Sequence, residues 1–225
     1  MLSWEFLGSG RGPGNGEELA LYRRGPEFSI RVNDSQLMDS CVHGSEDALA
    51  ELACAKIVGR PEPRVLIGGL GMGFTVAAAL RQIPSNGEII VAEWVPIVVT
   101  WNQGPLGHLA GHPLNDSRVT VREADVAHLL RTDEAAYDAI LLDVDNGPKG
   151  LTHKTNNWLY AQIGLETAHR ALRPKGILAV WSAMPNKAFA NRFRRTGFAV
   201  DEVHVRARGA QGGPHHVIWL GERGA

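Results

Sequence analysis

Four short apolar segments of this sequence each lead into residues that can bind a polar ligand or move a proton. The four endings are the glycine-rich turn 68–73, Glu93, Asp125 and Asp143. In a parallel sheet the carboxyl ends of the strands meet at one edge, and ligands bind there. We therefore expect the turn and the three carboxylates to form a single site.

The glycine-rich turn GGLGMG separates an apolar run from a run of small helix formers. Its glycines are Gly68, Gly69, Gly71 and Gly73. Such a turn places backbone N–H groups and a helix N-terminus against a ligand, although glycines at this point can also serve tight packing alone. Phe74 stands where a pyrophosphate-binding turn has its third glycine. The turn therefore fits an adenosyl-sulfonium ligand better than a nicotinamide dinucleotide.

Glu93 ends the next apolar segment, twenty residues after Gly73. An acidic side chain at this point accepts hydrogen bonds from ribose hydroxyls in nucleotide-binding α/β sheets; the alternative is an exposed carboxylate at a strand end. Trp94 follows directly and is the tryptophan best placed for ligand contact, although core packing is the commoner role of this residue.

The segments that position these residues alternate between strand-like and helix-like patterns from Arg64 onward. This alternation predicts an α/β fold whose mainly parallel, doubly wound sheet has helices on both faces. The seven predicted strands are 65–68, 88–93, 118–125, 137–143, 177–181, 198–205 and 215–220. The predicted helices are 74–82, 96–102, a short one after 125, 158–172 and 186–196. Two long final strands suit the Rossmann-like class I S-adenosylmethionine methyltransferase fold.

Residues 1–60 form a different region, which we expect to be an entry layer before an adenosyl-ligand-binding α/β domain at 61–225. The sequence GSGRGPGNG at 8–16 predicts a mobile loop. Segments 18–24 and 28–34 predict a β-hairpin, and Ser45-Glu46-Asp47 predicts the capped start of a helix that continues to about Val58.

Composition excludes several classes of partner. The 23 basic and 24 acidic residues nearly cancel and no stretch concentrates Lys and Arg, so we expect no nucleic-acid partner. No apolar run approaches the ~20 residues of a membrane span, and the N-terminus lacks the layout of a signal peptide. Two cysteines, Cys41 and Cys54, give no disulfide framework. These features predict a cytoplasmic protein without a membrane partner.

The histidines do not predict a metal site. His215 and His216 are adjacent in a predicted strand and point to opposite faces. His108 and His112 have helical spacing, but the glycines and proline around them argue against a helix. His43 flanks the proposed site and could touch a substrate. We therefore expect no metal.

Five stretches, in this order, resemble the spermidine and spermine synthases, the polyamine aminopropyltransferases. They are SIRVNDSQLM, RVLIGGLGMG, IIVAEWVPIVV, RVTVREAD and YDAILLDVDNGPKG, and the resemblance covers about residues 28–205. It implies a transferase with the methyltransferase-like fold. The implied co-substrate is decarboxylated S-adenosylmethionine or S-adenosylmethionine itself, and the implied partner is a small amine such as a polyamine. The resemblance also allows a homodimer.

The resemblance also implies which residues bind the adenosyl ligand. The four glycines of the turn and Trp94 would contact it. Gln36 and Glu93 would hold the ribose. Asp125, next to Ala124, would take the adenine amino group. Pro148 would border the adenine ring.

By the same resemblance Asp143 would face the reacting amine. A polyamine nitrogen has a solution pKa near that of lysine, ~10.4, and cannot attack carbon while it is protonated. A nearby carboxylate can orient the amine and take its proton. Asp143 ranks first for this role and Asp145 second, because Asp145 precedes Asn146-Gly147 and can instead cap a turn.

Three departures from the family pattern leave the reaction open. Gly71 stands where the synthases carry an acid that meets the ammonium group of the decarboxylated donor, Asn146 replaces a second aspartate, and an amine-pocket triplet reads Leu49-Ala50-Glu51. A charge-assisted hydrogen bond of this kind contributes roughly 1.5–3 kcal/mol. Aminopropyl transfer, methyl transfer and non-catalytic adenosyl binding all remain hypotheses.

Overall fold

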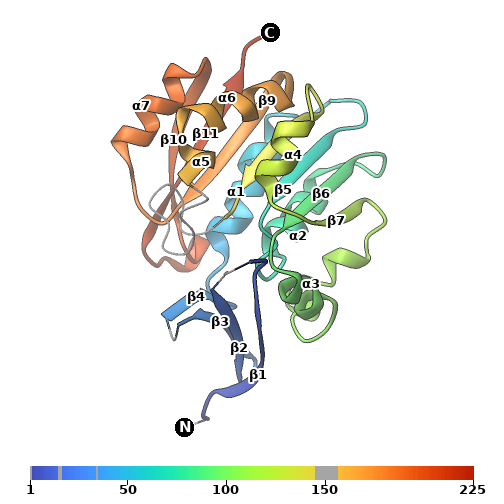
Figure 1. Cartoon of the computed structure of the whole chain (residues 1–225), viewed down its shortest axis with the longest axis vertical. Helices are drawn as coiled ribbons and strands as arrows, with labels where there is room; N and C mark the ends of the chain where they lie inside the picture. Colours follow the sequence, from blue (N-terminus) through green and yellow to red (C-terminus); the bar gives the residue numbers. More distant parts are fainter. Residues whose placement is uncertain (1, 15–16, 34, 145–156) are drawn as a thin grey trace.

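The computed structural model describes residues 2–14, 17–33, 35–144 and 157–225, which contain two separate sheets. The smaller sheet is antiparallel, has the order β1-β2-β3-β4 and lies below the larger one in Figure 1. Its strands are β1 (Glu5–Arg11), β2 (Glu18–Arg24), β3 (Glu27–Val32) and β4 (Ser35–Asp39). Strands β2 and β3 confirm the predicted hairpin, which is half of this sheet.

The larger sheet has seven strands in the order β10-β11-β9-β8-β5-β6-β7, and only β11 runs antiparallel to its neighbours. The strands are β5 (Arg64–Gly68), β6 (Glu88–Glu93), β7 (Val119–Glu123), β8 (Tyr137–Leu142), β9 (Leu172–Ser182), β10 (Phe198–Arg206) and β11 (His215–Arg223). This confirms the predicted α/β class. The strand order reverses between β5 and β8, and ligands bind at such a switch point in open α/β sheets.

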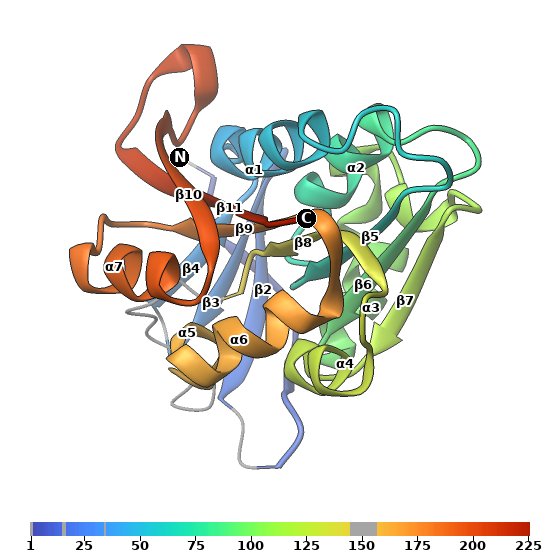
Figure 2. The same ribbon diagram turned by 90° about the horizontal axis from the view of Figure 1, so that it is seen from above.

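Helices cover both faces of this sheet (Figure 2). They are α1 (Gly44–Ala55), α2 (Phe74–Gln82), α3 (Pro96–Gln103), α4 (Val126–Thr132), α5 (Asn157–Tyr160), α6 (Gln162–Ala171) and α7 (Lys187–Arg195). The connection between α3 and β7 holds two short 3-10 helices, Gly107–Ala110 and Pro113–Asn115. Within the described residues, no helix is long and apolar enough to cross a membrane.

Alternating strand residues build a core on each face of the larger sheet. Val65 and Ile67 of β5 pack into the core that contains α1, α2 and α3, whereas Leu66 packs into the core with α4, α6 and α7. Successive side chains of a strand point to opposite faces, so strands covered on both sides are apolar at every position. The first core also includes Leu21 and Ile30 of the smaller sheet. The division of the chain at residue 60 stays a prediction.

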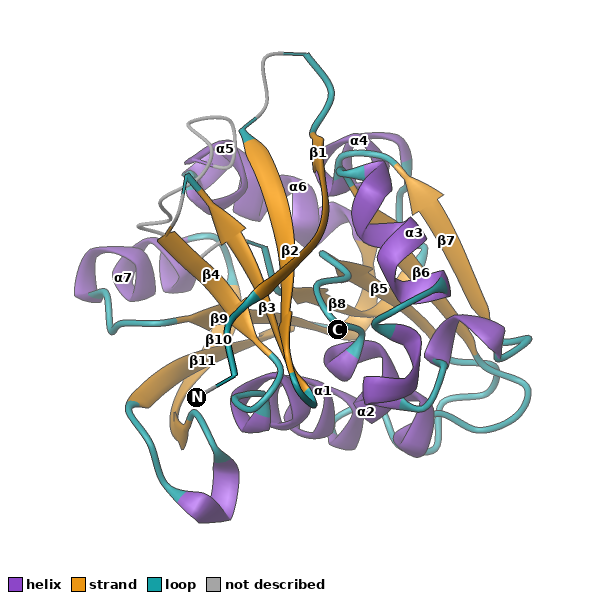
Figure 3. Ribbon diagram, turned by 90° about the horizontal axis from the view of Figure 1, so that it is seen from below, coloured by secondary structure: helices purple, strands orange, loops and turns teal. Residues whose placement is uncertain are grey.

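The prediction of a mobile loop at 8–16 was wrong for its first part, because β1 extends to Arg11 and pairs with β2. Gly8 lies at a bulge in this pairing. Gly10 lets β1 approach α3 closely, since a Cβ there would lie 2.8 Å from Ile97. The glycines therefore serve a packed edge strand, which Figure 3 shows crossing in front of the larger sheet.

Two predicted helix details also differ. The helix expected at 158–172 is divided into α5 and α6 by Ala161, which has an extended backbone (φ −75°, ψ 164°), and Leu172 already belongs to β9. Helix α1 begins at Gly44 after His43, and no side chain caps it. The Ser45 hydroxyl instead donates to the Glu46 carboxylate.

Candidate functional site

A cavity of about 470 Å³ lies between the smaller sheet and the carboxyl edge of the larger one. Its acidic lining residues are Glu17, Asp39, Glu46, Glu93, Asp125 and Asp143. Among the described residues that line it there is no lysine or arginine, and His216 is the one basic side chain. The cavity is therefore suited to positively charged ligands.

The glycine turn forms one wall of this cavity in left-handed backbone geometry. Gly69 has φ +90°, and a Cβ there would lie 2.4 Å from the Asp143 carbonyl oxygen. Gly71 has φ +53°, and a Cβ there would lie 2.7 Å from Met38 Cε. Because Gly69 has no side chain, the turn can approach the end of β8. At Gly71, the thioether of Met38 in β4 occupies the space next to the turn.

Asn102 of α3 is hydrogen-bonded to the turn, a contact that the sequence did not predict. Its Nδ2 donates to the Gly71 carbonyl (2.8 Å) and to the Val98 carbonyl (2.9 Å). Gly73, with φ +84°, is the N-cap residue before α2, and a Cβ there would lie 3.0 Å from Asn102 Oδ1. Gly68 ends β5, where a Cβ would lie 3.0 Å from Val126. The bond from Asn102 to Gly71 ties the turn to α3, and Gly68 and Gly73 leave little space for a side chain.

Glu93 is a buried carboxylate that joins β6 to the turn. Its Oε2 accepts from the Leu70 N–H and its Oε1 from the Val95 N–H, both at 2.8 Å. These two bonds fix the orientation of the carboxylate, which also lines the cavity. Trp94, 41% exposed, lines the same part of the cavity.

Asp125 has a structural role that the sequence did not predict. Its Oδ1 accepts from the Ala127 N–H at 2.8 Å and so caps α4. Asp125 and its neighbour Ala124 both line the cavity, as Gln36 of β4 does from the smaller sheet. The two sheets thus contribute opposite walls.

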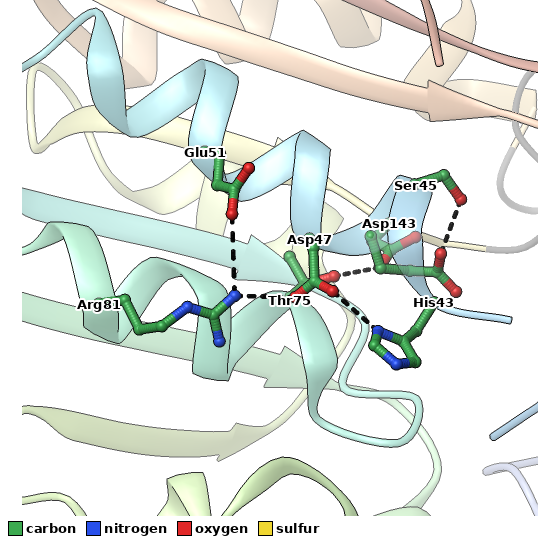
Figure 4. Close-up of polar contacts among 8 residues, drawn as sticks. His43, Ser45, Asp47, Glu51, Thr75, Arg81 and Asp143 are labelled. Carbon is green, nitrogen blue, oxygen red and sulfur yellow. Dashed lines mark hydrogen bonds and ion pairs between the residues drawn. The ribbon is translucent and has the colours of Figure 1, made fainter. Parts of the chain in front are cut away.

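Asp143 follows β8 and lies against the start of α2. Its Oδ2 accepts from the Thr75 hydroxyl at 2.6 Å (Figure 4). Burial raises the pKa of Asp143 to about 6, against the lowering effect of this hydrogen bond. A carboxyl group with such a pKa can exchange a proton near neutral pH, as a general base requires.

Glu46 is a second acid of the cavity, and sequence reasoning considered it only as part of a helix cap. Burial, followed by the Asp143 charge, raises its pKa to about 8. Ser45 Oγ lies 2.7 Å from Glu46 Oε2 and 2.9 Å from His216 Nδ1. The sequence carried no signal for this role, because the position of Glu46 in the cavity depends on how α1 packs.

The indole N–H of Trp181 is buried and has no hydrogen-bond acceptor among the described residues. The side chain lines the cavity and is 8% exposed. An indole N–H is a donor only, and buried donors are normally paired. A ligand acceptor is therefore expected near this edge of the cavity.

His43 lies outside the cavity, in a network that ties α1 to α2 (Figure 4). Its ring stacks on Phe74 at 4.0 Å and its Nδ1 lies 2.8 Å from Asp47 Oδ2. Arg81 Nη2 contacts Asp47 at 3.0 Å and Glu51 at 3.9 Å. The network is structural, and no substrate contact is expected of His43.

The cysteines are not activated nucleophiles. Burial, then the Asp39 and Glu27 charges, raises the pKa of Cys41. Burial raises the pKa of Cys54 to about 12. Both therefore stay as thiols near neutral pH.

The structure brings most of the predicted ligand residues to one cavity. Those that line it are Gln36, Gly69, Gly71, Glu93, Trp94, Ala124, Asp125 and Asp143. Gly68 and Gly73 belong to the turn without lining the cavity. Asp145 and Pro148 lie outside the described residues. The roles assigned to all these residues stay predictions.

Comparison with known proteins identifies the fold. No protein-family model and no curated protein sequence matches the chain. The solved spermidine synthase from Thermotoga maritima has a TM-score of 0.77 and 16% sequence identity, over 97% of this chain and 73% of its own. A spermidine synthase in complex with the transition-state analogue AdoDATO has a TM-score of 0.80 and 15% identity, over 97% of this chain and 74% of its own. The fold is therefore spermidine synthase-like.

Proposed function

We propose that this protein transfers an aminopropyl group from decarboxylated S-adenosylmethionine to a small amine. The observation that carries the proposal is the acidic cavity, in which Asp143 lies beside the glycine turn. The likeness to a spermidine synthase in complex with AdoDATO supports it. A cytoplasmic location and a homodimer remain expectations of the resemblance.

The electrostatics of the cavity favour cationic reactants. A decarboxylated donor carries a sulfonium and an ammonium group, and a polyamine carries ammonium groups. Six carboxyl groups line the cavity, with no lysine or arginine among its described lining residues. Both reactants are attracted to such a surface, whereas the carboxylate of ordinary S-adenosylmethionine would find no lysine or arginine among the described residues that line it.

The proposed reaction needs one proton transfer and one substitution. The Asp143 carboxylate takes a proton from the substrate ammonium group, which leaves a neutral amine. The nitrogen lone pair then forms the new N–C bond, while the electrons of the C–S bond move to sulfur and neutralise the sulfonium. Thr75 orients Asp143 through the 2.6 Å hydrogen bond. Proton removal by a positioned base typically contributes 10²–10⁴-fold.

Methyl transfer from S-adenosylmethionine is the second candidate, and Gly71 favours it. The acid that meets the donor ammonium in the synthases is absent at this position, and the flexible Met38 thioether occupies the adjoining space. Loss of that acid relieves repulsion against a donor carboxylate. The two candidates therefore share the nucleotide site and differ in the donor.

An assay with each donor and with putrescine, spermidine or cadaverine tests the proposal, because the nucleotide product identifies the reaction. Aminopropyl transfer gives methylthioadenosine and an amine enlarged by one aminopropyl group. Methyl transfer gives S-adenosylhomocysteine. We expect methylthioadenosine, detected by mass spectrometry, and formation of S-adenosylhomocysteine alone would replace the proposal with methyl transfer.

A further inference from the structure

Glu46, Ser45 and His216 form a hydrogen-bonded chain at the cavity that contains Asp143. The reaction proposed above assigns no role to these three side chains. Glu46 and His216 line the cavity together with Asp143, while Ser45 is fully buried between them. Ser45 Oγ contacts both Glu46 Oε2 (2.7 Å) and His216 Nδ1 (2.9 Å). The chain connects the first turn of α1 with the first part of β11.

We propose that Glu46, Ser45 and His216 carry away the proton that Asp143 removes from the attacking amine. Glu46 is then a further catalytic residue that receives this proton, and Ser45 and His216 are positioning residues that pass it on. The inference rests on the proposed function, because it concerns the fate of a proton released in that reaction.

The geometry can serve both protonation states of Glu46. When Glu46 is ionised, His216 Nδ1–H donates to Ser45 and the Ser45 hydroxyl donates to Glu46. When Glu46 is protonated, it donates to Ser45, which donates to a neutral His216. A hydroxyl group has one donor and two acceptor positions and rotates to suit either arrangement. Passing a proton along the chain therefore leaves no group unpaired.

Burial and neighbouring charges favour a proton on Glu46. Burial, followed by the Asp143 charge, raises the pKa of Glu46 to about 8, so Glu46 holds a proton near neutral pH and accepts one from Asp143 only as it passes its own to Ser45. Asp47 on the same helix raises the Glu46 pKa further. Asp39 of β4 and Glu17 before β2 are further acids that line the cavity.

His216 suits the end of the chain. Burial lowers its pKa, so its ring is neutral near pH 7 and can accept a proton. The side chain is only partly buried, which allows exchange with solvent. Its ring packs edge-on against Trp181, with 4.8 Å between centroids, and this contact fixes its orientation.

Turnover of three variants tests the relay. Glu46→Gln keeps the oxygen that faces Ser45 but cannot take a proton, and we expect turnover to fall about 10–100-fold. His216→Ala should also lose turnover, and added imidazole should restore it, because imidazole can carry the proton that the missing ring carried. Glu166→Gln is the matched control, since Glu166 lies on α6, which packs on the other face of the sheet.

A second measurement does not depend on activity. A carboxyl group whose folded pKa is raised contributes stability below its unfolded pKa and loses it as the pH rises through the folded value. For Glu46 this window runs from about 4.5 to about 8. The melting temperature of Glu46→Gln relative to wild type should therefore rise by at least about 2 °C between pH 5 and pH 8. Glu166→Gln should show no comparable rise.

The two measurements separate the two claims. If wild-type protein transfers nothing, the proposed function fails, and the melting temperatures still decide whether Glu46 holds a proton. A flat difference between Glu46→Gln and wild type would then overturn the inference. If wild-type protein is active, the inference fails when Glu46→Gln retains full turnover, or when imidazole does not restore His216→Ala.

Discussion

At the scale of single residues, Asp143 is the group on which the proposed chemistry depends. Two features define it, a hydrogen bond from Thr75 and a pKa raised by burial to about 6. The first sets the direction of the carboxylate, and the second keeps the group able to exchange a proton near neutrality.

Replacement of Asp143 by asparagine should separate catalysis from binding. Asparagine keeps the shape and an acceptor for the Thr75 hydroxyl but cannot take a proton. We expect turnover to fall about 10²–10⁴-fold while the affinity for methylthioadenosine, measured by calorimetry, changes little. A variant with near wild-type turnover would remove Asp143 from the role of base, and a large loss of nucleotide affinity would make it a binding residue.

The strand-end acids could be predicted from sequence because an apolar run followed by an acid is a local pattern. Glu93, Asp125 and Asp143 all line the cavity as this pattern predicts. Glu46 and Trp181 were not assigned to the site, because their positions there depend on how α1 and β9 pack. Such contacts between distant segments leave no fixed spacing in the sequence.

At the scale of elements, the glycine turn needs glycine for two reasons, its backbone conformation and its close approach to the end of β8. Gly69 and Gly59 both have positive φ, at +90° and +84°. A Cβ at Gly69 would lie 2.4 Å from the Asp143 carbonyl oxygen, whereas a Cβ at Gly59 meets nothing within 4 Å. A side chain at Gly59 would therefore meet backbone strain alone, whereas one at Gly69 would meet backbone strain and a steric clash.

Alanine at each glycine measures this difference. Gly59→Ala should cost only the strain of a left-handed residue, about 1–2 kcal/mol. Gly69→Ala should cost about 3 kcal/mol or more in the free energy of unfolding, because the end of β8 must also move. Denaturant unfolding provides both values. Equal losses would mean that the turn does not require the close approach to Asp143.

The seven strands of the larger sheet were predictable because buried parallel strands are short apolar runs between turn residues. Strands β1 and β4 were not. The glycines of β1 indicate a loop when read locally, and only the packing of Gly10 against Ile97 explains them. Strand β4 is a short edge strand with polar residues, so its pairing with β3 gives it little local signature.

At the scale of the whole molecule, the site exists because the two sheets meet. The smaller sheet supplies Gln36 and Met38, and the larger one supplies Glu93 and Asp143. Overall the chain is nearly neutral, with 23 basic and 24 acidic residues, so the acidic character belongs to this cavity and not to the protein as a whole. The ammonium group of a ligand is therefore attracted to the cavity between the two sheets.

Calorimetric titration with the two donors, under identical conditions, tests the central claim most directly. The acidic cavity should attract the ammonium of decarboxylated S-adenosylmethionine and repel the carboxylate of S-adenosylmethionine. We predict that the decarboxylated donor binds at least about tenfold more tightly, which corresponds to about 1.4 kcal/mol. Equal or tighter binding of S-adenosylmethionine, or binding of neither donor, would contradict the account.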